Sequence, residues 1–168
     1  MRTAVPAVVL FSFAALTLGG CDRETEQPIP FNHNLHVTRG ELECDSCHEY
    51  VLEEAFAGLP PVKICMRCHK NEDPENPASL KYIQAIRQAA SDGGQIGWVR
   101  LYELPRHVYF SHRRHTDIGG LDCKECHGDM AALTAPPPRP VVRALTMEGC
   151  IACHDEKNVD NDCSWCHR

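Results

Sequence analysis

After its first twenty residues, the sequence has no long apolar run and no excess of positive charge. The whole sequence has 17 basic and 23 acidic residues, and its formal net charge is −6 with neutral histidine. No basic stripe is therefore present to bind the phosphates of a nucleic acid. The apolar clusters are short and are interrupted by proline, glycine and polar residues, so side chains alone would form only a thin core. We expect another group to supply buried apolar surface.

The N-terminal segment carries the features of an export signal. Arg2 precedes an apolar run over residues 4–18, and small residues follow before Cys21. This pattern predicts a signal peptide at residues 1–20, and the ending LGGC resembles a bacterial lipoprotein signal, with Cys21 as the lipid attachment site. Residues 21–30 are charged and contain proline, which predicts a lipid-anchored tether. Ordinary secretion with a free Cys21 is the alternative.

The other ten of the eleven cysteines occur in CxxCH motifs. Two cysteines three apart can form thioethers with the two vinyl groups of one porphyrin, and the following histidine can bind the iron. The sequence therefore predicts five covalently bound haem c groups and their iron. The five motifs are Cys44-Cys47-His48, Cys65-Cys68-His69, Cys123-Cys126-His127, Cys150-Cys153-His154 and Cys163-Cys166-His167.

Two other uses of paired cysteines are weaker interpretations. Zinc ribbons place four ligands around one metal, and exported proteins often close CxxC pairs as disulfides. Neither use requires a histidine directly after every second cysteine, whereas haem c does.

Five further histidines equal the expected haems in number, which predicts two histidine ligands for each iron. Four of them stand in HxxH pairs, and a solvated surface position is the alternative for any one of them. Imidazoles three residues apart on a helical turn lie on the same side, so each pair can reach two irons. These histidines are His33, His36, His107, His112 and His115.

The chain repeats itself with an offset of 79 residues. Phe31, His33 and His36 precede the first CxxCH motif at the distances that separate Phe110, His112 and His115 from the third. We expect a two-haem module at residues 31–70, a connecting segment at 71–105 and a three-haem module at 106–168.

The connecting segment contains the only long helix that we predict. Asn76-Pro77 provides a cap and a first turn, apolar residues recur at helical spacing from Leu80 to Ala90, and Asp92-Gly93-Gly94 ends the pattern. Residues 135–140, APPPRP, predict a stiff extended loop. The expected fold class is a small, mainly α and irregular multihaem cytochrome c, with a few short helices and loops around five haems and little sheet.

The FxHxxH…CxxCH frame resembles the class III multihaem cytochromes c, and the second module resembles their three-haem members. The resemblance implies that His33 serves the His48 haem and His112 the His127 haem. It also implies that His36 reaches the His69 haem and that His115 reaches that of His154 or His167. Where the three-haem pattern has another distal histidine, this chain has Met147 (LTMEGC). His107 or Met147 would complete the set of ligands.

The stretch from Arg106 to His115, RHVYFSHRRH, is also similar to the pentahaem cytochrome domain of alternative complex III and related quinol oxidoreductases. With two ligands on every iron, no position is left for substrate. We therefore expect an electron-transfer protein and not an enzyme. A haem-lined extracellular filament, an outer-membrane electron conduit and a multihaem reductase are the alternative functions.

The partners and the location follow from the same features. We expect the chain to carry electrons outside the cytoplasm, between a membrane quinol-linked complex and periplasmic acceptors. Lipid on Cys21 would anchor it to the periplasmic face of a bacterial membrane. Asp22 resembles a signal for retention at the inner membrane, which we favour over the outer one. No nucleic acid partner is expected.

Overall fold

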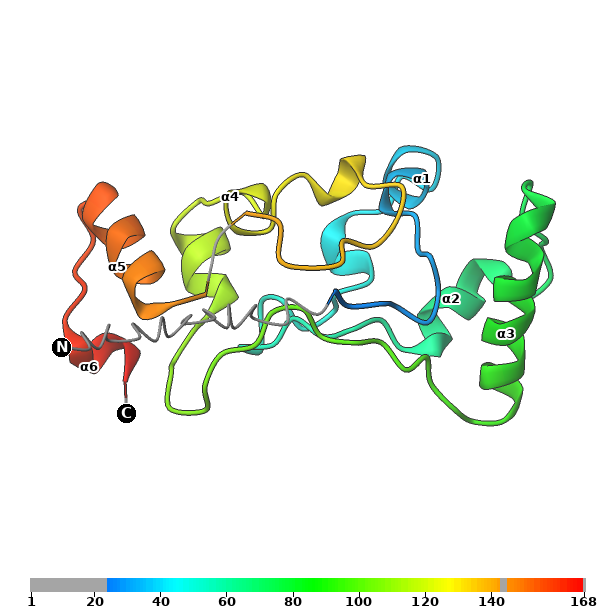
Figure 1. Cartoon of the computed structure of the whole chain (residues 1–168), viewed down its shortest axis with the longest axis horizontal. Coiled ribbons are helices and arrows are strands. Elements are labelled where there is room, and N and C mark those ends of the chain that lie inside the picture. Colours follow the sequence, from blue (N-terminus) through cyan, green and yellow to red (C-terminus); the bar gives the residue numbers. More distant parts are fainter. Residues whose placement is uncertain (1–23, 143–144, 168) are drawn as a thin grey trace, which may run out of the picture.

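The computed structural model describes residues 24–142 and 145–167. The predicted signal peptide and Cys21 lie outside them. Within these residues the chain is elongated, with α2 and α3 at one end and α5 and α6 at the other (Figure 1). The elements are α1 (His33–Thr38), η1 (Cys44–Ser46), α2 (Val62–His69), η2 (Pro77–Ser79), α3 (Leu80–Ser91), η3 (Arg114–Ile118), α4 (Lys124–His127), η4 (Met130–Ala132), α5 (Met147–Glu156) and α6 (Cys163–Cys166).

The described part of the chain contains no strand, and its β-type pairing is an isolated bridge between Val108 and His167. Short helices and loops make up the rest, in agreement with the expected fold class. None of the helices in the described ranges is long and apolar enough to cross a membrane.

The predicted helix of the connecting segment is confirmed. The Asn76 side chain accepts a hydrogen bond from the Ala78 backbone N–H, and Pro77 occupies the first turn. The helix then continues as α3 to Ser91 and buries Ile83 and Ile86. Gly93 follows with a φ of +67°, a left-handed conformation that glycine adopts without steric cost and that ends helices.

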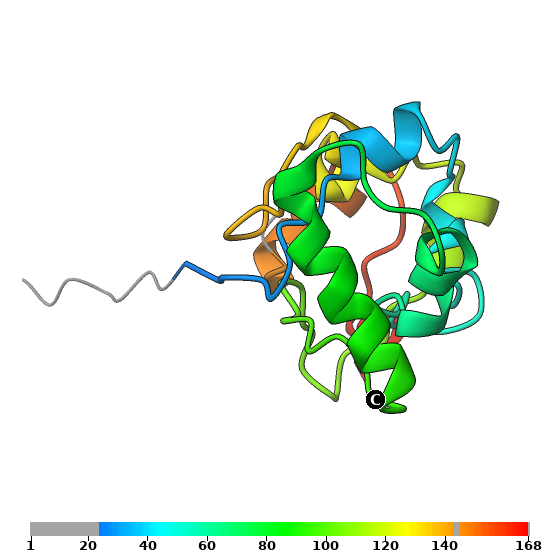
Figure 2. The ribbon, with the colours of Figure 1, turned by 90° about the vertical axis from the view of Figure 1, so that its right-hand side faces the viewer.

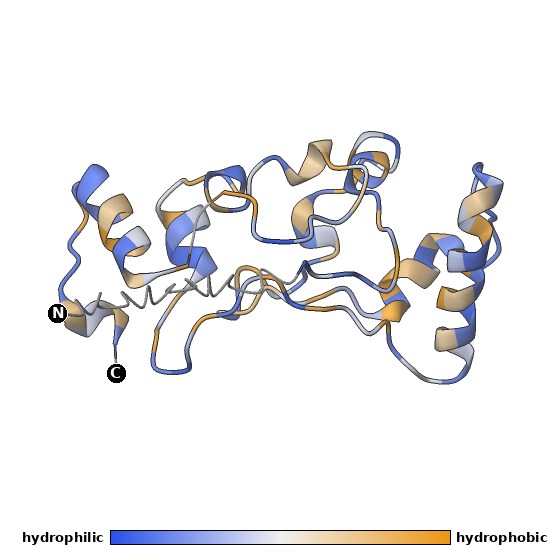
Figure 3. Ribbon diagram, in the orientation of Figure 1, coloured by the Kyte–Doolittle hydropathy of each residue, from blue (hydrophilic) through white to orange (hydrophobic). Residues whose placement is uncertain are grey.

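The apolar core is small and lies at the α2–α3 end. Ile29, Val62, Ile83 and Ile86 form one buried cluster. Other apolar segments are spread along the whole molecule (Figure 3), and no large side chain of the described residues is completely buried. In the view along the long axis, helices and loops surround a central region (Figure 2). The chain thus lacks the continuous side-chain core of an ordinary domain of its length.

Residues 24–30, the described part of the predicted tether, are held against the fold. The Thr25 backbone N–H donates to the Pro138 carbonyl at 2.8 Å, and the Gln27 side chain makes two hydrogen bonds with the Val99 backbone, at 2.7 and 2.9 Å. Glu24 pairs with Arg139 at 2.9 Å. The APPPRP loop therefore contacts the tether that precedes the first module.

Candidate haem-binding sites

The two copies of the FxHxxH frame have the same local geometry. Phe31 stacks on His36 with ring centroids 4.3 Å apart and meets His33 edge-on at 4.8 Å. In the second copy, Phe110 stacks on His115 at 4.6 Å and meets His112 edge-on at 4.8 Å. Each phenylalanine thus fixes the orientation of two imidazoles, and the sequence repeat is also a structural repeat.

Hydrogen bonds to backbone carbonyls fix which ring nitrogen stays free. Nδ1 of His36 donates to the Asn32 carbonyl, and Nδ1 of His115 donates to the Ser111 carbonyl, both at 2.8 Å. His48 donates to the Gly58 carbonyl at 2.7 Å and His154 to the Asp160 carbonyl at 3.3 Å. A proton on Nδ1 leaves the Nε2 lone pair free for a metal ion, as in other metal-ligating histidines.

Four of the five spare histidines each lie beside the histidine of a different CxxCH motif. Imidazole nitrogens bind transition metals at about 2 Å, so two rings on opposite sides of one ion have centroids about 6 Å apart. The observed centroid distances match this value: 6.1 Å for His36–His69, 6.4 Å for His112–His127, 6.1 Å for His115–His154 and 5.6 Å for His107–His167. Four imidazole pairs therefore have the spacing that suits one iron each.

His33 lies close to the remaining motif histidine, His48. Burial lowers the pKa of His33, and the nearby charges of His48 and His36 lower it further. Burial also lowers the pKa of His69, His112 and His127. A lowered pKa favours the neutral imidazole, which is the form that binds iron. His33 and His48 are thus close enough to interact, and they are the two histidines that the four ring pairs leave over.

The chain leaves two buried polar atoms unsatisfied at equivalent positions of the repeat. Nδ1 of His33 and Nδ1 of His112 have no hydrogen-bond partner among the described residues. Buried polar atoms are normally paired. Together with the four imidazole pairs and the sparse core, these atoms fit a chain that folds around a large cofactor.

Each CxxCH motif forms about one helical turn. The backbone N–H of His48 donates to the Cys44 carbonyl, that of His127 to Cys123 and that of His167 to Cys163, each at 3.0 Å. The second and fourth motifs lie within α2 and α5. This turn brings both thiols and the imidazole to one side, as attachment to one porphyrin edge requires.

None of the ten cysteines of these motifs is joined to another by a disulfide. Burial raises the pKa of the Cys44, Cys47 and Cys65 thiols. No group of three or more His, Cys, Asp or Glu side chains converges within residues 24–142 and 145–167. The described motifs thus present pairs of imidazoles and not the four-ligand cluster of a zinc ribbon.

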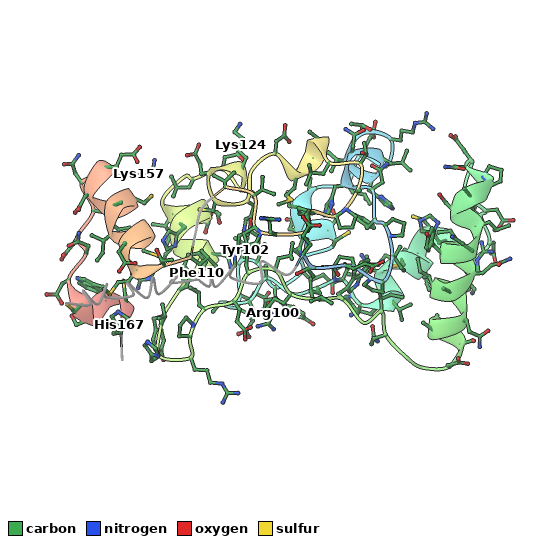
Figure 4. The ribbon with its side chains drawn as sticks, viewed as in Figure 1. Arg100, Tyr102, Phe110, Lys124, Lys157 and His167 are labelled. Carbon is green, nitrogen blue, oxygen red and sulfur yellow. The ribbon has the colours of Figure 1, made fainter. Side chains whose placement is uncertain are left out.

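His107 and Met147, the two candidates for the last iron ligand, have different surroundings. His107 stacks against His167, in the bend that also joins the Tyr109 backbone N–H to the Cys166 carbonyl at 2.7 Å. Figure 4 shows His167 near the α6 end of the molecule. Met147 begins α5 and its side chain is 58% exposed. The geometry thus favours His107 as the partner of His167.

Three residues that support the sites were not identified from the sequence. A Cβ at Gly40 would lie 2.5 Å from the His36 carbonyl oxygen, and one at Gly119 would lie 2.7 Å from that of His115. The 79-residue offset also relates these two glycines, so the sequence repeat could have identified both of them. Tyr102 meets His127 edge-on at 4.6 Å and lies in the central part of the molecule (Figure 4). No motif marks its position in the sequence.

Two family models cover most of the chain. The class III cytochrome C family matches residues 15–96, and cytochrome c7 and related cytochrome c matches residues 108–168. The chain is also 27% identical, over 167 aligned residues, to the menaquinone reductase, multiheme cytochrome c subunit, of Nitratidesulfovibrio vulgaris (strain Hildenborough). That alignment spans 86% of this chain and 78% of the relative. With its repeated histidine frames and CxxCH turns, the chain is a multihaem c-type cytochrome, similar to class III cytochrome c in its first part and to cytochrome c7 in its second, and these matches support electron transfer by haem c.

Proposed function

We propose that the chain is a pentahaem electron carrier in which every iron has two histidine ligands. The observation that carries the proposal is the pairing of four spare histidines with four CxxCH histidines at centroid distances of 5.6–6.4 Å, which leaves His33 and His48 for the fifth pair. The proposed pairs are His33 with His48, His36 with His69, His112 with His127, His115 with His154 and His107 with His167.

Bound haem supplies one-electron chemistry at its iron. The chain's own residues would hold each haem through the two cysteines and the histidine of its CxxCH motif together with a second histidine. Phe31 and Phe110 orient the HxxH imidazoles, and carbonyl groups fix the Nδ1 protons of His36 and His115. With two imidazoles per iron, no position is left for a substrate, so the proposed role is electron transfer and not catalysis. Histidine as the second ligand also favours lower potentials than methionine.

Carbon monoxide tests for an open iron site. Reduced protein with five histidine-paired irons is expected not to bind carbon monoxide rapidly. Rapid binding of one molecule per chain would reveal a vacant position and would support a reductase. The His107→Ala variant is the positive control, because it removes one proposed ligand and should gain one carbon monoxide site.

The intact mass of the purified protein tests the haem count. Five haem masses above the mature polypeptide and its lipid are expected. A second preparation with Cys163→Ser and Cys166→Ser, which removes the thioethers of the last motif, should lose one haem mass. Four or fewer haems on the fully processed wild-type chain would contradict the proposal.

We propose that the partners are a membrane quinol-linked complex and periplasmic electron acceptors. The relative is named as a subunit of a menaquinone reductase, and this support comes from that name and from the sequence features. The net charge of −6 favours partners with basic docking faces, through attraction that weakens with salt. Co-purification with a quinone-reactive membrane subunit is the expected result.

We propose attachment to the periplasmic face of the inner membrane through lipid on Cys21. Several acyl chains anchor a protein durably, whereas one chain alone is marginal. Cys21→Ser should move the protein from the membrane fraction into the soluble periplasm. Wild-type protein that is already soluble there would contradict the anchor, and wild-type protein in the outer-membrane fraction would contradict the inner-membrane assignment.

A further inference from the structure

Two hydrogen bonds of Asn34 join the predicted two-haem module to the three-haem module. Asn34 lies between His33 and His36 on α1. Its backbone N–H donates to the Leu133 carbonyl at 2.9 Å, and its side-chain amide donates to the Ala131 carbonyl at 3.0 Å. Ala131 and Leu133 follow closely after His127, the histidine of the third motif. α1 is therefore fixed beside the first haem motif of the second module.

The 79-residue repeat shows that this connection is specific to the first copy. Asn34 corresponds to Arg113, whose side chain pairs with Asp117 on its own helical segment at 3.4 Å. The two frames share their phenylalanine and histidine geometry but not this residue. Asn34 is thus not needed to orient the imidazoles of a frame, which leaves the contact between modules as its function.

Other groups place the first motif of each module at the same junction. Cys44 lies near Cys123. His48 lies near both His112 and His127, and backbone groups of Glu54 and Ala55 lie close to the His112 ring. The imidazole pairs of His48 and His127 are therefore neighbours across the junction.

The other motifs lie outward from this junction. His36, on the same helix as His33, reaches His69 at the end of α2. His115, one turn after His112, reaches His154 in α5. Figure 1 shows the corresponding order along the long axis: α3, α2, α1, α4, and then α5 with α6.

We propose that Asn34 joins the two modules at their first haem motifs. The haems of His48 and His127 then lie next to each other in the middle of the molecule. The haem of His69 lies at one end, and those of His154 and His167 lie at the other end. This order rests on the proposed five haems and differs from the order of the motifs in the sequence. Electrons that cross the whole molecule would pass through the His48 and His127 sites, and external partners would meet the haems at the two ends.

The iron positions in crystals of the full, haem-loaded protein test the order. Anomalous scattering locates each iron, and the chain trace assigns it to its motif. The irons of His48 and His127 are expected to be the closest pair between the two modules. A closer approach of the His69 iron to the second module would overturn the inference even if five haems are present. Fewer than five haems, by contrast, would contradict the proposed function first.

Asn34→Leu tests the role of Asn34 in joining the two modules. The variant keeps a side chain of similar size but loses the amide donor to Ala131. We expect altered redox midpoints and altered low-spin electron paramagnetic resonance signals for the His48 and His127 haems, with the haem count unchanged. Thr38→Val is the matched control, because Thr38 bonds to the Asn34 carbonyl within α1. Unaltered midpoints and signals in Asn34→Leu, or the same changes in both variants, would overturn the role of Asn34.

Discussion

At the scale of single residues, the Nδ1 hydrogen bonds of the histidines determine what each ring can do. His36 and His115 donate to the carbonyl four residues earlier, and this bond needs only the helical turn on which the histidine lies. Each turn then presents one Nε2 atom in a fixed direction. Because Phe31 and Phe110 stack on the same rings, little rotation remains, and each proposed ligand is preorganised for its iron.

His107 provides the most direct test of the ligand assignment. His107→Ala should convert one of the five haems from low spin to high spin, because the His167 iron loses its second imidazole. Optical and electron paramagnetic resonance spectra measure this change. Met147→Ala is the matched comparison and should leave the spectra unchanged, since Met147 is exposed on α5. The reverse pattern would make Met147 the ligand and His107 a surface residue.

The backbone at Glu41 offers a stabilising substitution. Glu41 has a φ of +52°, and Gly120, its counterpart in the second copy, has a φ of +65°. A side chain in the left-handed region costs about 1–2 kcal/mol, and the added freedom of an unfolded glycine offsets part of that gain. Glu41→Gly should therefore stabilise the haem-loaded protein by about 0.5 kcal/mol, measured by denaturant unfolding.

The reverse substitution in the second copy is the control. Gly120→Ala should destabilise the protein by about 1 kcal/mol, although nothing lies within 4 Å of the added Cβ. A loss of stability in Glu41→Gly would mean that the glutamate side chain contributes more than its backbone conformation costs.

At the scale of elements, the structure shows which features can be predicted from local sequence. The helix of the connecting segment was predictable because Asn76, Pro77 and the apolar spacing act within a few residues of each other. The pairings of His36 with His69 and of His107 with His167 were not derivable in this way. They join positions 33 and 60 residues apart, and only packing of the complete chain brings the rings together.

α3 stabilises α2, which carries the second CxxCH motif. Ile83 and Ile86 pack against Val62 in the buried cluster, and the Arg87 side chain donates to the His69 carbonyl at 2.7 Å. Ile83→Ala should lower the free energy of unfolding by about 2–4 kcal/mol, because it removes buried methyl groups and leaves a cavity. Denaturant unfolding of the haem-loaded protein measures the loss.

Gln84→Ala is the control on the same helix, because Gln84 is exposed. Its effect should stay within about 0.5 kcal/mol. Equal effects of the two substitutions would show that the small cluster is not a principal source of stability and that α3 does not support the α2 motif through packing.

At the scale of the whole molecule, the described side chains alone provide little buried surface. Ile29, Val62, Ile64, Ile83 and Ile86 are the buried apolar residues of the described ranges, and thirteen large apolar side chains there are exposed. At about 25 cal/mol per Å² of buried apolar surface, five buried side chains cannot balance the conformational entropy of a chain of this length. The ordered fold therefore depends on apolar surface that the haems contribute.

This dependence predicts that the chain without haem is unfolded. Far-ultraviolet circular dichroism of protein made without haem attachment should show mostly disordered chain, since the short helices around the motifs are too brief to be stable alone. The variant that lacks only Cys163 and Cys166 is the graded control: with four haems it should keep most of its helix signal, because the buried cluster and the Asn34 contact lie far from α6. A haem-free chain with native helix content and cooperative unfolding would show that the protein alone specifies the fold, and that the haems bind to a preformed scaffold.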